Sequence, residues 1–149
     1  MVHALGEIHR VLKSQGRLID IRPIAASWPV EVVTNNRVVK TAKLTDHSSA
    51  VDDDRAADQA MIAAESRGWY NKLEETHFVL NYYWDTPSEM QEFIQTEWEG
   101  FESLDERTFE EIKSSWATAD GDARLRISLK IQVSGWGKKV GLRNSILTL

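Results

Sequence analysis

Apolar side chains alternate with polar ones most regularly near the carboxyl end of the chain. In residues 124–133 one face carries Leu125, Ile127, Leu129, Ile131 and Val133. This two-residue period is typical of a strand with one face on the core and the other wet or partly covered. Residues 74–84 alternate similarly but are apolar on both faces near their end, which predicts a strand covered on both sides. A shorter apolar run at residues 17–22, stopped by Pro23, predicts a third strand.

Two more apolar runs, at residues 30–34 and 37–44, predict a hairpin. They are rich in β-branched residues and are joined by Asn35 and Asn36. Asparagine tolerates a positive φ, so an Asn-Asn pair suits a two-residue hairpin turn. We expect this hairpin, over residues 30–44, at the margin of the sheet, followed by a polar loop at residues 45–50.

Apolar residues at helical spacing predict four helices, two over residues 2–13 and 52–67 and two that begin at residues 86 and 105. The helix at residue 86 has the strongest start signal, since Thr86 can cap it, Pro87 suits the first helical position and Glu89 closes a capping box. After the first helix, Gly16 suits a left-handed cap.

These elements predict an α+β fold, in part α/β, with a small mixed β-sheet covered by helices. We expect one domain over residues 1–149, because the chain has the length of a single domain and no linker divides it. The tail, residues 135–149, has three glycines in its first seven positions and is expected to be loose.

Charge and composition limit the partners that we expect. The net charge is -5, and basic residues are scattered apart from a weak cluster at Lys138, Lys139 and Arg143. A nucleic-acid-binding protein usually carries a basic face, so we predict no nucleic-acid partner. No apolar run approaches the roughly 20 residues that span a bilayer, so we predict no membrane partner and a cytoplasmic location.

A metal site is not expected. There is no cysteine, which excludes thiolate ligands and disulfides. The four histidines show no ligand spacing, and a metal site needs ligands that converge. They are His3, His9, His47 and His77.

Residues 7–21 read Glu-Ile-His-Arg-Val-Leu-Lys-Ser-Gln-Gly-Arg-Leu-Ile-Asp-Ile. This run resembles the helix end, turn and fifth strand of class I S-adenosylmethionine-dependent methyltransferases. Their typical pattern is glutamate-hydrophobe-x-arginine-valine-leucine-lysine-proline-glycine-glycine, and Ser14-Gln15 here replaces the proline-glycine pair. The strand end at residues 82–85 and the strand at 124–133 fit the sixth and seventh strands. The resemblance therefore implies the second half of a Rossmann-like methyltransferase fold.

The same resemblance implies that the cofactor-binding half is missing. In that family S-adenosylmethionine binds a glycine-rich loop after the first strand and an acidic residue after the second. Both precede the matched region, so no S-adenosylmethionine binding is expected for the isolated chain. Gly135, Gly137 and Gly141 follow a predicted strand, but no βαβ unit comes after them, so they are not expected to form a cofactor loop.

Candidate substrate-binding residues follow from the same comparison. In open α/β sheets, ligands bind beyond the carboxyl ends of the parallel strands. The residues that the resemblance places there are Arg22, Tyr83, Trp84, Asp85 and Arg124. Arginine suits an anionic group, and tyrosine and tryptophan offer flat apolar contact. The alternative interpretation is that Arg22 and Asp85 form surface ion pairs without a function.

Three functions are compatible with this sequence. The chain is a methyltransferase-like fragment without methyl-transfer activity on its own, a small-molecule-binding module, or a protein-interaction module.

In the parent fold a strand flanks each side of residues 17–21, so loss of one neighbour exposes an edge beside Leu18, Ile19 and Ile21. The unpaired backbone groups of such an edge can bond to a strand of another chain. This predicts a homodimer. The competing possibility is that the hairpin at residues 30–44 covers this edge.

Overall fold

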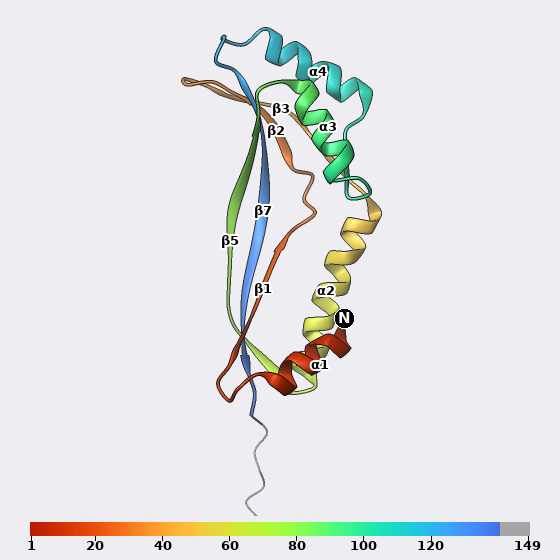
Figure 1. The fold of residues 1–149 in the computed structure, drawn as a ribbon, viewed down its shortest axis with the longest axis vertical. Coiled ribbons are helices and arrows are strands. Elements are labelled where there is room, and N and C mark those ends of the chain that lie inside the picture. Colours follow the sequence, from red (N-terminus) through yellow and green to blue (C-terminus); the bar gives the residue numbers. More distant parts are fainter. Residues whose placement is uncertain (141–149) are drawn as a thin grey trace, which may run out of the picture. The chain divides into compact units, whose positions relative to one another are not determined.

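The fold is known from a computed structural model that describes residues 1–140. In chain order its elements are α1 (Val2–Val11), β1 (Arg17–Pro23), β2 (Pro29–Val33), β3 (Val38–Lys43), β4 (Thr45–Asp46), α2 (Ser48–Ser66), β5 (Tyr70–Trp84), α3 (Pro87–Glu97), β6 (Glu102–Ser103), α4 (Glu106–Ala117) and β7 (Arg124–Lys138). Figure 1 shows these helices and strands along the chain. The described residues thus have the predicted α+β composition, with four helices and a five-stranded sheet.

The long strand β7 organises the sheet. The strand order is β1-β7-β2-β3, and β5 pairs with β7 as well. β2 pairs antiparallel with β7, from Val30 opposite Ile127 to Val33 opposite Arg124. The sheet is antiparallel, so the prediction of a mixed sheet is wrong. The reason is that β7 runs opposite to β1, β2 and β5 and lies beside each of them.

The predicted hairpin is confirmed as β2 and β3, and it lies at the end of the strand order. Its register shifts between Val30 and Glu31, which marks a bulge. The turn is closed by a hydrogen bond from the Thr34 amide to the Arg37 carbonyl, 2.8 Å long. Neither asparagine of this turn has a positive φ, so that part of the expectation is wrong.

Contacts divide the chain into two compact units. Of the described residues, unit 1 contains 1–21, 55–76 and 132–140, and unit 2 contains 22–54 and 77–131. The core of unit 1 lies between α1, α2 and the sheet. It consists of Leu5, Ala60, Met61, Ala64, Tyr70 and Trp136. The Tyr70 hydroxyl donates to the Leu5 carbonyl at 3.0 Å, which satisfies this buried polar group.

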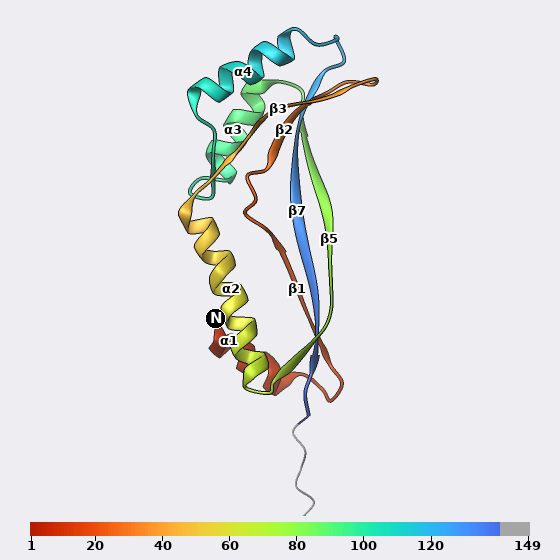
Figure 2. The ribbon, with the colours of Figure 1, turned by 180° about the vertical axis from the view of Figure 1, so that it is seen from behind.

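The core of unit 2 lies under α3 and α4. It consists of Trp28, Val30, Leu44, Met90, Ile94, Ile112, Leu125, Ile127, Leu129 and Ile131. The alternating side chains of residues 125–131 are thus buried, as their period predicts. In Figure 2, α3 and α4 lie on the same side of β2, β5 and β7. The capping box of α3 is confirmed, since the Thr86 hydroxyl accepts from the Glu89 amide and the Glu89 carboxylate accepts from the Thr86 amide.

Several predicted boundaries are wrong. The segment 45–50 is not a loop, because Thr45–Asp46 form β4 and α2 begins at Ser48. The tail is ordered further than expected, since Gly135–Lys138 belong to β7 and Trp136 is only 6% exposed. The Lys138 amide donates to the Gly16 carbonyl at 2.9 Å, which holds this end of β7 against β1. Residues 141–149 of the predicted loose tail lie outside the described residues.

β5 is not covered on both sides. Neighbouring residues point to opposite faces of a strand, yet both Phe78 and Val79 are about half exposed. The sequence could not show this, because an apolar strand face predicts burial only where another layer packs on it. Among the described residues, no helix is long and apolar enough to cross a membrane.

Candidate functional site

Three of the five predicted substrate-binding residues lie together. Arg124 Nε is 2.7 Å from Asp85 Oδ1, and the Arg124 guanidinium lies over the Tyr83 ring, 5.4 Å from its centre. The Arg124 and Asp85 side chains are 50% and 73% exposed. This geometry fits the alternative interpretation for Asp85, a surface ion pair, and such pairs contribute little to stability.

The other two predicted residues lie apart from this cluster. Trp84 is on the opposite face of β5, within the aromatic group that covers the unit 2 core. Its partners there are Tyr82, Phe93 and Trp98, with ring centres 5.3–6.3 Å away. Arg22 Nη1 donates to the Asp54 carbonyl at 3.0 Å. The structure therefore does not gather all five residues into one wall.

A second ion pair, which the sequence did not reveal, lies beside the Tyr83 cluster. Arg126 Nε is 2.7 Å from Glu31 Oε2, and Glu31 is only 4% exposed. Hydrogen bonds to Glu31 and then to Tyr83 raise the pKa of Arg126. Arg124 and Arg126 each have a carboxylate partner, so an anionic substrate would have to compete with Asp85 and Glu31. This face of the sheet is therefore better suited to stabilising the fold than to binding an anion.

The segment after β1 is held by two carboxylates. Asp46 accepts from the Ser27 amide at 2.8 Å and from its hydroxyl at 3.0 Å. Asp54 accepts from the Ala25 amide at 2.8 Å. Ser27 has a φ of 47°, a left-handed conformation that costs a non-glycine residue free energy unless its surroundings hold it. Asp46 provides those contacts and is thereby fixed in place.

Asp46 also faces a second carboxyl group. In the pairing of β4 with β6, Asp46 lies directly opposite Glu102. Glu102 is 3% exposed, and its Oε2 has no hydrogen-bond partner within the described residues. Burial, followed by the charge and the hydrogen bond of Asp46, raises the pKa of Glu102 to about 8. At neutral pH Glu102 is therefore mostly protonated.

A cavity of about 350 Å³ opens beside Glu102. Its walls come from α3, the segment that follows α3, and His47, which lies between β4 and α2. The residues that line it are His47, Gln91, Ile94, Gln95, Glu99, Gly100, Glu102, Ser103 and Leu104. It combines a buried carboxyl group, polar side chains and a short apolar wall, which is the usual make-up of a small-ligand site. We call it the Glu102 cavity.

The sequence did not single out Asp46 or Glu102. Asp46 lay in a segment predicted to be a loop, and Glu102 stands 56 positions further along the chain. Only the pairing of two two-residue strands brings them together. In the sequence, each of these acidic residues stands in a short segment beside a helix. Acidic residues are common in such segments, so neither one predicts a site.

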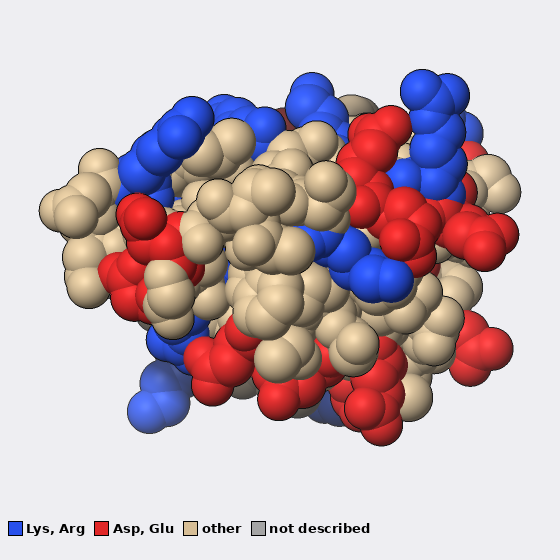
Figure 3. Space-filling view, turned by 90° about the horizontal axis from the view of Figure 1, so that it is seen from above, with Lys and Arg blue, Asp and Glu red and all other residues tan. Residues whose placement is uncertain are grey.

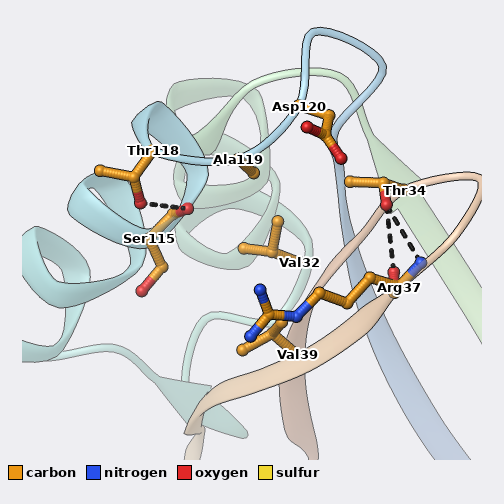
Figure 4. A pocket seen from close by; sticks show the side chains of 8 residues that line it. All are labelled: Val32, Thr34, Arg37, Val39, Ser115, Thr118, Ala119 and Asp120. Atoms are coloured by element: carbon orange, nitrogen blue, oxygen red, sulfur yellow. Dashed lines mark hydrogen bonds between the residues drawn. The ribbon is translucent and has the colours of Figure 1, made fainter.

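A smaller hollow lies between the β2–β3 hairpin and the end of α4. It measures about 210 Å³ and is lined by Val32, Thr34, Arg37, Val39, Ser115, Thr118, Ala119 and Asp120. Figure 4 shows the Arg37 side chain extending past Val39 toward Val32, with Asp120 on the opposite rim. The Thr118 hydroxyl donates to the Ser114 and Ser115 carbonyls. A single exposed arginine and an aspartate do not define one class of ligand.

Charged residues of both signs share the surface seen from above. Figure 3 shows basic side chains mainly along the upper rim of that face and acidic side chains mainly along its lower and right-hand parts, with uncharged residues between them. Within residues 1–140, no group of three or more histidine, aspartate or glutamate side chains could hold a metal ion. Comparison with known protein families, curated proteins and solved structures finds no match for this chain.

Proposed function

We propose that this chain is the substrate-side half of a class I methyltransferase fold and has no methyl-transfer activity on its own. The turn after α1 supports the proposal. The left-handed residue is Gln15, with a φ of 64°, and not Gly16 as expected; a Cβ added at Gly16 would instead lie 2.7 Å from Leu12 Cδ2. These are the two positions where the methyltransferase pattern has glycines, and each has a backbone requirement that glycine meets best.

The neighbours of β1 are also compatible with this proposal. In the methyltransferase fold the strand matched by β1 has a strand on each side, and the last strand of the chain runs opposite to it. Here β7, the last strand within residues 1–140, runs antiparallel to β1 and lies on one side of it. Among the described residues no strand pairs with its other side.

The open edge of β1 is the observation that carries the proposal. The Gly16 carbonyl and the Ile24 amide bond to β7, so even-numbered residues direct their backbone groups toward β7. Ile19 and Ile21 therefore direct their amides and carbonyls toward the open edge. Their side chains are 50% and 63% exposed. A strand supplied by the cofactor-binding half would satisfy these backbone groups and cover part of this apolar surface.

Hydrogen exchange tests the proposal. The chain is compared alone and together with the polypeptide encoded directly upstream, which is expected to carry a glycine-rich βαβ unit. The amides of Ile19 and Ile21 should exchange rapidly in the chain alone and become protected in the complex, and S-adenosylmethionine should bind the complex only. An upstream sequence without such a unit would contradict the proposal. So would binding of the cofactor to the isolated chain with a dissociation constant below about 10 µM.

The second candidate function is a protein-interaction module that forms a homodimer in the cytoplasm. The observation that favours it is the same open edge, because the hairpin does not occupy it: β2 pairs with β3 and β7. Without a cofactor-binding half, a second copy of the chain is the simplest partner for two exposed isoleucines beside unpaired backbone groups. The two candidates differ in what covers β1, and the oligomeric state separates them.

A further inference from the structure

We propose that the open edge of β5 in unit 2 pairs with the same edge of a second copy of this chain, antiparallel and about a two-fold axis. In unit 2 this edge consists of residues 77–84. The inference does not depend on the methyltransferase proposal, because the paired residues belong to unit 2 and none lies in β1.

β5 is paired on one side only. In Figure 1, β5 lies on one side of β7, and β1 and β2 lie on the other; among the described residues no further strand pairs with β5. The Lys130 carbonyl accepts from the Ile24 amide at 3.0 Å, so Lys130 and Ser128 direct their backbone groups away from β5. Asn81 lies opposite Ser128, whose hydroxyl is 2.8 Å from Asn81 Oδ1. The amide and carbonyl of Asn81, and those of the other odd-numbered residues of this edge, therefore point to its open side.

The sequence of this edge contains none of the features that discourage pairing. Residues 77–84 include no lysine, arginine, aspartate, glutamate, proline or glycine. Folded proteins usually protect an open edge with such residues, and β3, at another edge of the same sheet, carries Lys40 and Lys43. The large apolar side chains of the β5 edge are instead 42–59% exposed: Phe78, Val79, Leu80 and Tyr83. An uncharged, apolar and open strand edge favours pairing with another strand.

This edge is complementary to itself, which identifies a second copy as its partner. When the two-fold axis passes beside Asn81, aromatic side chains of one copy lie opposite aliphatic or aromatic side chains of the other. Such pairs stabilise antiparallel strands. Tyr82 and Trp84 already pack against the unit 2 core, so the second copy would extend this packing. The opposed pairs are Asn81–Asn81, Val79–Tyr83, Leu80–Tyr82 and Phe78–Trp84.

Charge favours this register over its neighbours. An axis one residue nearer the start of β5 would place Glu75 opposite Asp85 of the second copy, and like charges directly opposite destabilise a strand pair. An axis two residues nearer would place Glu75 opposite the apolar ring of Tyr83. The axis beside Asn81 leaves Glu75 outside the paired residues and places His77 opposite Asp85, whose side chain is 73% exposed.

Translational diffusion measured by NMR, at chain concentrations from about 0.05 to 1 mM, tests the pairing. The Ile21→Lys variant is the background, so that β1 does not contribute to association. A strand pair of this length buries less than the roughly 1,200 Å² of a stable interface, so we expect a dissociation constant on the order of 1 mM. About half of the chains should then be paired at 1 mM and fewer than about a tenth at 0.05 mM.

Variants on this background locate the interface. Val79→Lys places a charge in the middle of the paired segment and should weaken association at least about tenfold. Val38→Lys is the matched control, because it makes the same substitution at a similarly exposed valine of β3, and it should associate as the background does. Circular dichroism checks that each variant is folded.

Cross-linking tests the register and does not depend on loss of association. The chain has no cysteine, so an introduced one is unique. Asn81→Cys would bring two Cα atoms to about 5.5 Å across the axis, which suits a disulfide. The two copies of Val79→Cys would be offset by four residues, about 14 Å, and should not link. Oxidised glutathione should therefore yield a covalent dimer with Asn81→Cys only.

The proposal is supported if Asn81→Cys links selectively and Val79→Lys, but not Val38→Lys, loses association. Equal linking of the two cysteine variants or equal association of the two lysine variants would overturn it. So would association that continues beyond dimers, since a two-fold pair closes at two chains, or no association of the folded background variant at 1 mM. None of these outcomes depends on what covers β1.

Discussion

Single residues decide the turn between α1 and β1. Gln15 adopts a φ of 64°, and a Cβ at Gly16 would lie 2.7 Å from the Leu12 side chain and 2.8 Å from the Lys13 carbonyl. Gln15→Gly should raise the free energy of unfolding by about 0.5 kcal/mol, because relief of left-handed strain exceeds the entropic cost of glycine. Gly16→Ala should lower it by roughly 1–3 kcal/mol. Urea denaturation measures both, and Gly121→Ala, whose Cβ would meet nothing within 4 Å, should change little.

Glu102 makes stability depend on pH. Its pKa is raised from about 4.5 to about 8 in the folded state, so the unfolded chain loses this proton first. The stabilising contribution is complete below pH 4.5 and is lost as the pH rises toward 8. The Glu102→Gln variant should therefore lose less stability as the pH rises from 4.5 to 8. At pH 8 its free energy of unfolding should exceed that of the unchanged protein by about 2 kcal/mol. Denaturation midpoints at several pH values measure the effect. An equal slope in both proteins would contradict the assignment, and Glu99→Gln is the control from the same cavity.

At the scale of elements, α3 depends on its amino-terminal cap. Thr86 and Glu89 satisfy amides that the first turn leaves without helical partners. Thr86→Ala should lower the free energy of unfolding by about 1 kcal/mol. Thr96→Ala is the matched control within the same helix, since its hydroxyl bonds only to the Glu92 and Phe93 carbonyls, and it should cause no comparable loss. A thermal denaturation series in which both variants lose equal stability would argue against a special role of the cap.

At the scale of the whole molecule, the edge of β1 is expected to control assembly. When no other half is bound, we predict a homodimer at tens of micromolar, because Ile19 and Ile21 are exposed beside unpaired backbone groups. Ile21→Lys should shift sedimentation equilibrium toward monomer. Val38→Lys places the same charge at a similarly exposed position on β3 and should leave the dimer intact. A strict monomer for the unchanged chain would exclude the dimer, whereas dissociation by both variants would place the interface elsewhere.

Much of the local structure was determined by the sequence itself. The alternation at residues 125–131 predicted a strand with one buried face, and the threonine, proline and glutamate at residues 86–89 predicted a helix start. The runs on either side of Asn35-Asn36 predicted the hairpin. These predictions succeed because strand period, helix capping and turn formation depend on residues close together in the chain.

The tertiary structure alone decided which distant residues meet. The Asp46–Glu102 pair and the Arg126–Glu31 pair each join strands that are far apart in sequence, and no local pattern specifies such pairings. Burial was likewise decided by neighbours: Trp136 is covered by the unit 1 core, while Phe78 and Val79 on a strongly apolar strand remain exposed. An apolar side chain favours burial, but only the packing of other layers against it determines whether it is buried.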